Sequence, residues 1–171
     1  MDDKVHSICQ TLNKIIITEG NNLIKIYEKR KVKEPIRTIN LNSQIRCVNS
    51  NKEKGLLIGY YEGKISIENF NQTEGYSFKC HRIEKENEII AYPVNSIEPH
   101  PNKEYFTSVG SDGFIYFWDN EKKKKIRRSH EYSGRYNIDE FSINNVKYNK
   151  DGSVCAISLG NISEEDSELD R

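Results

Sequence analysis

The sequence lacks long apolar runs, net charge of either sign and, with one exception, methionine. A membrane-spanning helix needs roughly 18 or more apolar residues in succession, and no run approaches that length. Residues 1–4 are acidic and polar, where a secretory signal would be basic and then apolar. The 26 basic and 26 acidic residues cancel, so no overall field favours nucleic acid or an anionic membrane. We expect a soluble intracellular protein with no membrane partner, in which any electrostatic site is local.

The sequence also lacks paired cysteines. The four cysteines stand 33 or more residues apart and none belongs to a Cys-x-x-Cys pair; they are Cys9, Cys47, Cys80 and Cys155. This spacing argues against a zinc site and against a disulfide framework. We therefore expect reduced structural thiols, no metal and no cofactor.

Isoleucine, tyrosine and phenylalanine are plentiful, and Gly and Asn turn signals separate the apolar stretches. These β-branched and aromatic residues favour strands, whereas the helix formers Ala, Leu and Met are scarce. The composition predicts an all-β fold.

A degenerate repeat runs through the chain. Similar units begin at Val5, Ile45, Val94 and Ile143, at separations of 40, 49 and 49 residues, which is about the length of one WD-repeat blade. We predict a partial WD-repeat β-propeller over residues 4–160, with about four blades and the last one incomplete. The predicted blades are 4–30, 44–70, 92–119 and 137–160.

Each unit has a continuous apolar second strand, and polar stretches follow the units. The apolar runs, at 15–17, 56–58, 105–107 and 154–156, predict strands that are covered on both faces. The polar stretches at 29–33, 71–75 and 122–125 indicate inter-blade loops or outer edge strands. Residues 161–171 are rich in acids without apolar periodicity, which predicts a disordered acidic tail.

Residues 110–119 read Gly-Ser-Asp-Gly-Phe-Ile-Tyr-Phe-Trp-Asp. This segment resembles the turn and the Trp-Asp end of a WD repeat. The resemblance implies structural roles for Asp112 and Gly113 in the turn and for Trp118 and Asp119 at the strand end. Asp112 would lock the blade by hydrogen bonds, and Trp118 would pack between sheets.

A more specific combination is Phe-Lys-Cys-His-Arg at 78–82 followed by Tyr-Pro-Val-Asn at 92–95. It resembles the mitotic checkpoint WD-repeat family that partners the Bub kinases (Bub-three), and the sister family, the messenger-RNA export propeller of the nuclear pore. Glu68, Tyr92 and Phe114 resemble the checkpoint family, while Val109 resembles the export sister. The likeness extends over residues 4–160 and covers the last four blades of a seven-bladed family.

The resemblance implies a non-enzymatic scaffold of the spindle assembly checkpoint in the nucleus and at kinetochores, with a cytoplasmic pool. Arg82, with Lys79 of the same motif, would bind acidic peptide motifs of a Bub-family checkpoint kinase. A guanidinium offers five donors in a planar fork that matches carboxylates. The alternative role of Arg82 is an inter-blade salt bridge.

The same resemblance implies that Lys124 binds a phosphorylated kinetochore scaffold, with Lys123 beside it in a lysine cluster. The companion basic position of the family is Asn102 in this chain, and Lys103 is the candidate substitute. A solvated charge run is the alternative interpretation of the cluster.

Two other functions stay open. One is messenger-RNA export with binding of a nucleoporin motif, and the other is a generic ubiquitin-ligase adaptor. Catalysis is not expected, because Cys80 and His81 are adjacent on a strand and point to opposite faces. His6, His100 and His130 lack metal-site spacing. The three blades missing relative to the family leave three explanations: an incomplete sequence, closure by dimerisation, or a partner chain.

Overall fold

The computed structural model describes residues 4–20, 22–71, 74–85, 87–129 and 141–161, and all regular elements in these ranges are β-strands. The predicted all-β class is confirmed. The first sheet contains β1 (Val5–Gln10), β2 (Lys14–Glu19), β3 (Leu23–Glu28) and β4 (Arg37–Asn40). The second contains β5 (Ile45–Asn51), β6 (Gly55–Tyr60), β7 (Lys64–Asn69) and β8 (Tyr76–Lys79). The third contains β11 (Val94–Pro99), β12 (Tyr105–Gly110), β13 (Ile115–Asp119) and β14 (Lys124–Ser129), and the fourth contains β15 (Phe141–Tyr148) and β16 (Cys155–Asn161).

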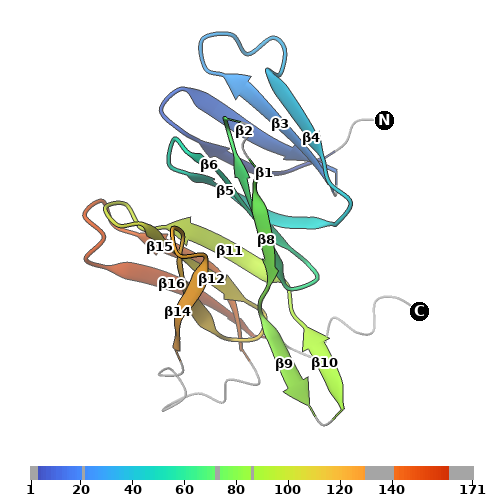
Figure 1. The fold of residues 1–171 in the computed structure, drawn as a ribbon, viewed down its shortest axis with the longest axis vertical. Coiled ribbons are helices and arrows are strands. Elements are labelled where there is room, and N and C mark those ends of the chain that lie inside the picture. Colours follow the sequence, from blue (N-terminus) through green and yellow to red (C-terminus); the bar gives the residue numbers. More distant parts are fainter. Residues whose placement is uncertain (1–3, 21, 72–73, 86, 130–140, 162–171) are drawn as a thin grey trace.

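Every sheet is an antiparallel meander, and the sheets follow one another in chain order (Figure 1). Their first strands run alongside one another in the same direction. Arg46 near the start of β5 donates to Asn95 near the start of β11 (3.2 Å), and Asn95 donates to Ser142 near the start of β15 (3.0 Å). This radial stacking of meanders is the blade arrangement of a propeller.

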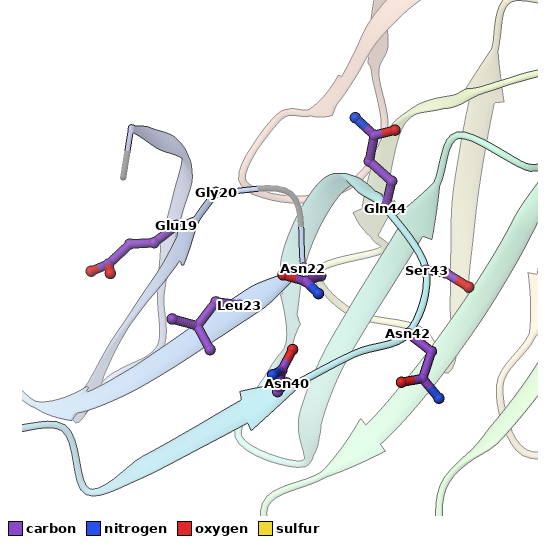
Figure 2. Close-up of a pocket in the computed structure, with 8 residues that line it drawn as sticks. All are labelled: Glu19, Gly20, Asn22, Leu23, Asn40, Asn42, Ser43 and Gln44. Carbon is purple, nitrogen blue, oxygen red and sulfur yellow. The ribbon is translucent and has the colours of Figure 1, made fainter. Parts of the chain in front are cut away.

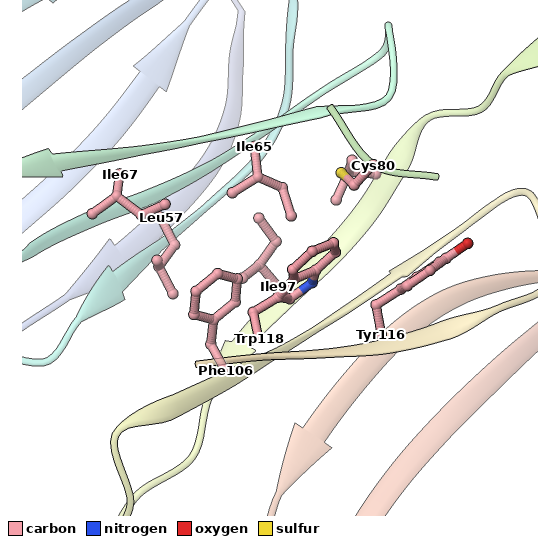
Figure 3. Close-up of a cluster of buried hydrophobic side chains, with 9 residues drawn as sticks. Leu57, Ile65, Ile67, Cys80, Ile97, Phe106, Tyr116 and Trp118 are labelled. Atoms are coloured by element: carbon pink, nitrogen blue, oxygen red, sulfur yellow. The ribbon is translucent and has the colours of Figure 1, made fainter. Parts of the chain in front are cut away.

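The hydrophobic core lies between consecutive sheets. Ile16, Ile24 and Ile26 of the first sheet pack against Leu56 and Ile58 of the second. Figure 3 shows the next interface, where side chains of the second sheet face aromatic rings of the third. Its main members are Leu57, Ile65, Ile67, Phe106 and Trp118. Each inner sheet therefore buries both of its faces.

The apolar second strands are covered on both faces only where a sheet lies on each side. All six residues of β6 are buried, as are five of the six in β12. In β2 only Ile16 and Thr18 are buried. The prediction is wrong for the last run, because Cys155 and Ala156 are exposed. The two ends of the described stack have no neighbouring sheet to cover their outer faces.

The polar stretches at 29–33, 71–75 and 122–125 do not join sheets. Each connects the third and fourth strands of one sheet, and the last runs into β14. The inter-blade interpretation is wrong, because the fourth strands are short and polar and leave a weak sequence signal. The edge-strand alternative is right for Lys124 and Lys125, which lie in the outermost strand β14. Residues 72–73 of these stretches, 137–140 of the predicted last blade and 162–171 of the predicted tail lie outside the described residues.

A β-hairpin that the sequence did not predict separates the second sheet from the third. It pairs β9 (Arg82–Lys85) with β10 (Glu88–Ala91) and projects from the stacked sheets (Figure 1). Ile89 on β10 is 62% exposed.

Because the strands reverse at every turn, the connections gather at two opposite ends of the stack. We call the end with the connections after β2, β4, β6, β8 and β12 the hairpin rim, since it carries β9 and β10. The end with the connections after β1, β3, β5, β7, β11 and β13 is the lysine rim. Arg82 lies on the first, and residues 122–123 lie on the second.

Candidate functional site

Arg82 is held on the hairpin rim by backbone carbonyls. Its Nη2 donates to the oxygen of Glu62 (2.8 Å) and its Nε to the oxygen of Gly63 (3.3 Å). Gly63 has a φ of 62°, and a Cβ there would lie 2.6 Å from the carbonyl oxygen of Cys80. Glycine is thus required for the turn that presents these oxygens. No carboxylate of the described residues pairs with Arg82, so the inter-blade salt bridge is not found there.

Lys79 ends β8 on the same rim and is exposed. Its Cα partner across the sheet is Lys64 of β7. The Nζ of Lys64 lies 3.8 Å from a carboxylate oxygen of Glu62. Two lysines directly opposite each other repel, so a bound anion would relieve a local excess of positive charge.

A buried hydrogen-bond network is centred on His81, the residue before Arg82. His81 Nδ1 lies 2.7 Å from Asp112 Oδ1, and His81 Nε2 lies 2.8 Å from Ser108 Oγ. Trp118 Nε1 donates to the same Ser108 hydroxyl (2.9 Å), and the Tyr116 hydroxyl donates to Asp112 Oδ2 (3.4 Å). The network joins the connection after the second sheet to three strands or turns of the third.

The predicted structural residues all lie in or beside this network. Gly113 has a φ of 72° in the turn after Asp112, and the Phe114 amide donates to Asp112 Oδ1 (3.3 Å). The Trp118 ring packs 4.6 Å, centroid to centroid, from Phe78 of the second sheet. Asp119 Oδ1 accepts from the amide of Lys122 (2.8 Å) and so closes the turn before β14.

Ser108, His81 and Asp112 have the connectivity of a hydrolytic triad, but their surroundings differ from those of an active site. The His81 and Asp112 side chains have no exposed surface, and Ser108 is fully buried. The Ser108 oxygen already accepts the Trp118 N–H bond, and a nucleophile must be reachable by its substrate. The arrangement fits a cross-link between sheets.

The lysine rim carries the second set of predicted residues. Lys124 begins β14 opposite Asp119, and Asp119 lies next to Tyr105 at the start of β12. Lys103 precedes that strand and holds its Nζ 6.0 Å from the Tyr105 ring centroid. Lys123 has a φ of 51° and its Nζ lies 4.8 Å above the Tyr76 ring. All three lysines therefore lie at one end of the third sheet.

Asn102, which stands where the family has a basic residue, is engaged with the fourth sheet. Its Nδ2 donates to the carbonyl oxygen of Asp151 (2.8 Å). The amides of Asn102 and Lys103 both donate to Nδ1 of the buried His100 (3.1 Å each). His100 thus shapes this loop. The structure does not bring Arg82 and Lys124 together, because they lie on opposite rims.

Sequence reasoning missed two groups of residues. It treated His81 only as the neighbour of Cys80 and did not consider Ser108. The signal available was a serine and a Trp-Asp end on adjacent strands that flank the Gly-Ser-Asp-Gly turn. It also missed the side-chain amides at the ends of β3, β4 and β5 on the hairpin rim, where Asn recurs at Asn22, Asn40 and Asn42.

The four thiols are free. Burial raises the pKa of Cys9 and of Cys47 to about 12, and raises the pKa of Cys80 further. The exposed Cys155 has a pKa raised by partial burial. Within the described residues no three His, Cys, Asp or Glu side chains group as metal ligands. The same residues include no helix of the length and apolarity that a membrane span requires. His130 lies outside them.

The fold matches solved structures, one of them a β-propeller. A β-propeller domain of Cps50 (Swd1) from Myceliophteria thermophila superposes with a TM-score of 0.70 at 7% identity, over 90% of this chain and 50% of that one. Raptor from Chaetomium thermophilum gives 0.68 at 16% identity, over 94% of this chain and 16% of that one. No protein-family model matches the chain. By fold, the chain is a partial β-propeller.

Curated relatives give the particular family. The mitotic checkpoint protein BUB3.1 of Arabidopsis thaliana is 29% identical over 95% of this chain and 48% of the relative. The spindle assembly checkpoint protein bub3 of Schizosaccharomyces pombe is 32% identical over 82% and 44%, and the mRNA export factor GLE2 of Chaetomium thermophilum is 28% identical over 92% and 44%. The chain is a Bub3 homologue over most of its length, and Gle2 is the sister family. It spans about half the length of these relatives.

Proposed function

We propose that the chain acts as a non-enzymatic scaffold of the spindle assembly checkpoint, which binds an acidic peptide motif of a Bub-family kinase through Arg82. Homology to Bub3 supports the checkpoint role, and the geometry of Arg82 supports the binding role. In this proposal a rigid propeller rim orders an extended partner segment and catalyses no reaction. The proposed sites of action are the nucleus and kinetochores, with a cytoplasmic pool.

The carbonyl contacts prepare Arg82 for carboxylate binding. They use two of its five N–H donors, fix the guanidinium plane and leave the other donors without a partner among the described residues. The carboxylate of Glu62, whose backbone oxygen accepts from Arg82, is already engaged by Ser43 (2.9 Å) and Lys64 (3.8 Å). A partner carboxylate would therefore meet an oriented cation, with Lys79 adding charge nearby.

The first prediction concerns Arg82→Glu. Charge-assisted hydrogen bonds contribute about 1.5–3 kcal/mol, so reversal of this charge should weaken binding of a Bub-kinase acidic peptide by at least about tenfold. Isothermal titration with the full chain measures the loss. Arg30→Glu is the matched control, because Arg30 is exposed on the lysine rim and should leave affinity unchanged. Unchanged affinity of the Arg82→Glu variant would contradict the proposal that Arg82 binds the acidic peptide.

The lysine rim is the proposed phosphopeptide site. Lys124 is exposed at the start of β14, and neither it nor Lys103 forms an ion pair with a described carboxylate. A phosphate near neutral pH carries nearly two negative charges and accepts several hydrogen bonds. A phosphorylated kinetochore scaffold repeat is the ligand that the family resemblance implies.

The second prediction is that a phosphothreonine peptide of such a repeat binds more tightly than its unphosphorylated form. Lys124→Glu should weaken the phosphopeptide about tenfold and leave the unphosphorylated peptide unaffected, because only the phosphate contact is lost. Fluorescence anisotropy measures both. Lys85→Glu is the control, since Lys85 is an exposed lysine at the end of β9 and lies away from the lysine rim. Equal affinity for the two peptide forms would contradict the proposal.

A second candidate function is messenger-RNA export with binding of a nucleoporin motif. The match to GLE2 over 92% of the chain favours it. Localisation separates the candidates. Kinetochore foci in mitosis support the checkpoint role, whereas a nuclear-rim signal together with RNA crosslinking supports export.

A further inference from the structure

The hairpin rim contains a pocket of about 630 Å³ one sheet away from Arg82. Figure 2 shows its two sides: residues at the end of β2 and the start of β3, and the connection from β4 to β5. The lining residues are Glu19, Gly20, Asn22, Leu23, Asn40, Asn42, Ser43 and Gln44. Nearly every lining side chain is polar, and no cation is among them.

Four side-chain amides line this pocket: Asn22, Asn40, Asn42 and Gln44. Within the described part of the chain, none of these amides forms a side-chain hydrogen bond. The backbone oxygens of Asn22 and Gln44 are engaged instead, since they accept from Leu41 (2.9 Å) and Tyr61 (3.2 Å). The backbone is thus satisfied, while the amide groups are available to a ligand.

The pocket is close to electrically neutral. Its single carboxylate, Glu19, pairs with Lys25. A neutral site with several amides has no preference for a phosphate or a metal ion. Each amide carries one acceptor and a donating NH₂ group, so it complements a peptide unit, which presents one C=O and one N–H.

The pocket is linked to Arg82 through Glu62. Ser43 on the pocket wall donates to the carboxylate of Glu62 (2.9 Å), and the backbone oxygen of Glu62 accepts from Arg82 (2.8 Å). Glu62 therefore contacts both a residue of the pocket wall and Arg82. Packed sheets lie about 10 Å apart, and an extended chain covers about 3.3 Å per residue. A ligand would need roughly three or more residues to pass from one place to the other.

We propose that the amide pocket binds the main chain of the same extended peptide whose acidic side chain binds Arg82, three or more residues away. The inference rests on the proposed function and adds a second contact to it. The amides bind the peptide backbone. Affinity for this part of the partner therefore depends on its length and on an extended conformation, and its side chains can vary.

The third prediction uses the acidic peptide of the Arg82 test in its full length and in two series shortened from either end. Asn40→Ala combined with Asn42→Ala should weaken the full-length peptide about tenfold. One series should contain a shortened peptide that binds more weakly and is no longer sensitive to the double variant. Arg82→Glu should weaken every peptide that keeps the acidic residue. Titration calorimetry on the full chain measures each pair.

Asn13→Ala is the control, since this exposed asparagine lies on the lysine rim and its side chain has no hydrogen bond among the described residues. Side-chain NH₂ resonances of the pocket amides should shift with the full-length peptide only. Full affinity of the double variant, or an equal loss for short and long peptides, overturns the inference while Arg82 dependence survives. Loss of Arg82 dependence overturns the proposed function instead. Shifts caused by a neutral oligosaccharide in place of the peptide also overturn the inference.

Discussion

At the scale of single residues, His81 combines an unfavourable backbone with well-satisfied side-chain contacts. Its φ of 47° lies in the left-handed region, where a non-glycine residue costs about 1–3 kcal/mol. Its ring bonds to Asp112 and Ser108 and lies edge-on to Tyr116 (centroids 4.6 Å apart). The contacts offset the strain and hold the chain direction that carries Arg82, the next residue, onto the rim.

The fourth prediction is that Asp112→Ala lowers the free energy of unfolding by about 3 kcal/mol, because it leaves buried His81 and Tyr116 donors without an acceptor. Urea denaturation measures the loss. Asp119→Ala is the control and should cost about 1 kcal/mol, since Asp119 is only partly buried and bonds mainly to turn amides. Equal losses would show that the network contributes no more than a turn contact.

At the scale of elements, strands of similar sequence differ in burial according to their neighbours. Ile17 of β2 and Ile58 of β6 occupy equivalent positions, opposite Ile8 and Val48 of their first strands. Ile58 has no exposed surface, whereas Ile17 is partly exposed and Ile8 is 67% exposed. The difference arises because the first sheet covers Ile58 and no described sheet covers Ile17.

The fifth prediction uses this matched pair. Ile58→Ala should cost about 3–4 kcal/mol of unfolding free energy, because it leaves a cavity between two sheets. Ile17→Ala should cost about 1 kcal/mol, because water already reaches that face. Chemical denaturation of both variants provides the comparison. If Ile17→Ala costs as much as Ile58→Ala, another surface covers the first sheet in solution.

At the scale of the whole molecule, the two proposed sites lie at opposite ends of the stacked sheets. Lys124 and Arg82 are separated by the length of a blade, so two partner segments can bind together without competing. The fold itself supplies this separation, since alternate connections of a meander fall on opposite rims.

What the sequence by itself determined is local: strand composition, the repeat with starts at Val5, Ile45, Val94 and Ile143, and the motif that carries Arg82. Residue alternation and turn residues act over a few positions, so they can be read without the fold. Only the tertiary structure decided which strands are covered, that His81 meets Asp112 and Ser108, and that four amides share a pocket. These depend on sheets stacking, which joins residues 27 and 31 positions apart in the case of His81. No local pattern specifies such a contact.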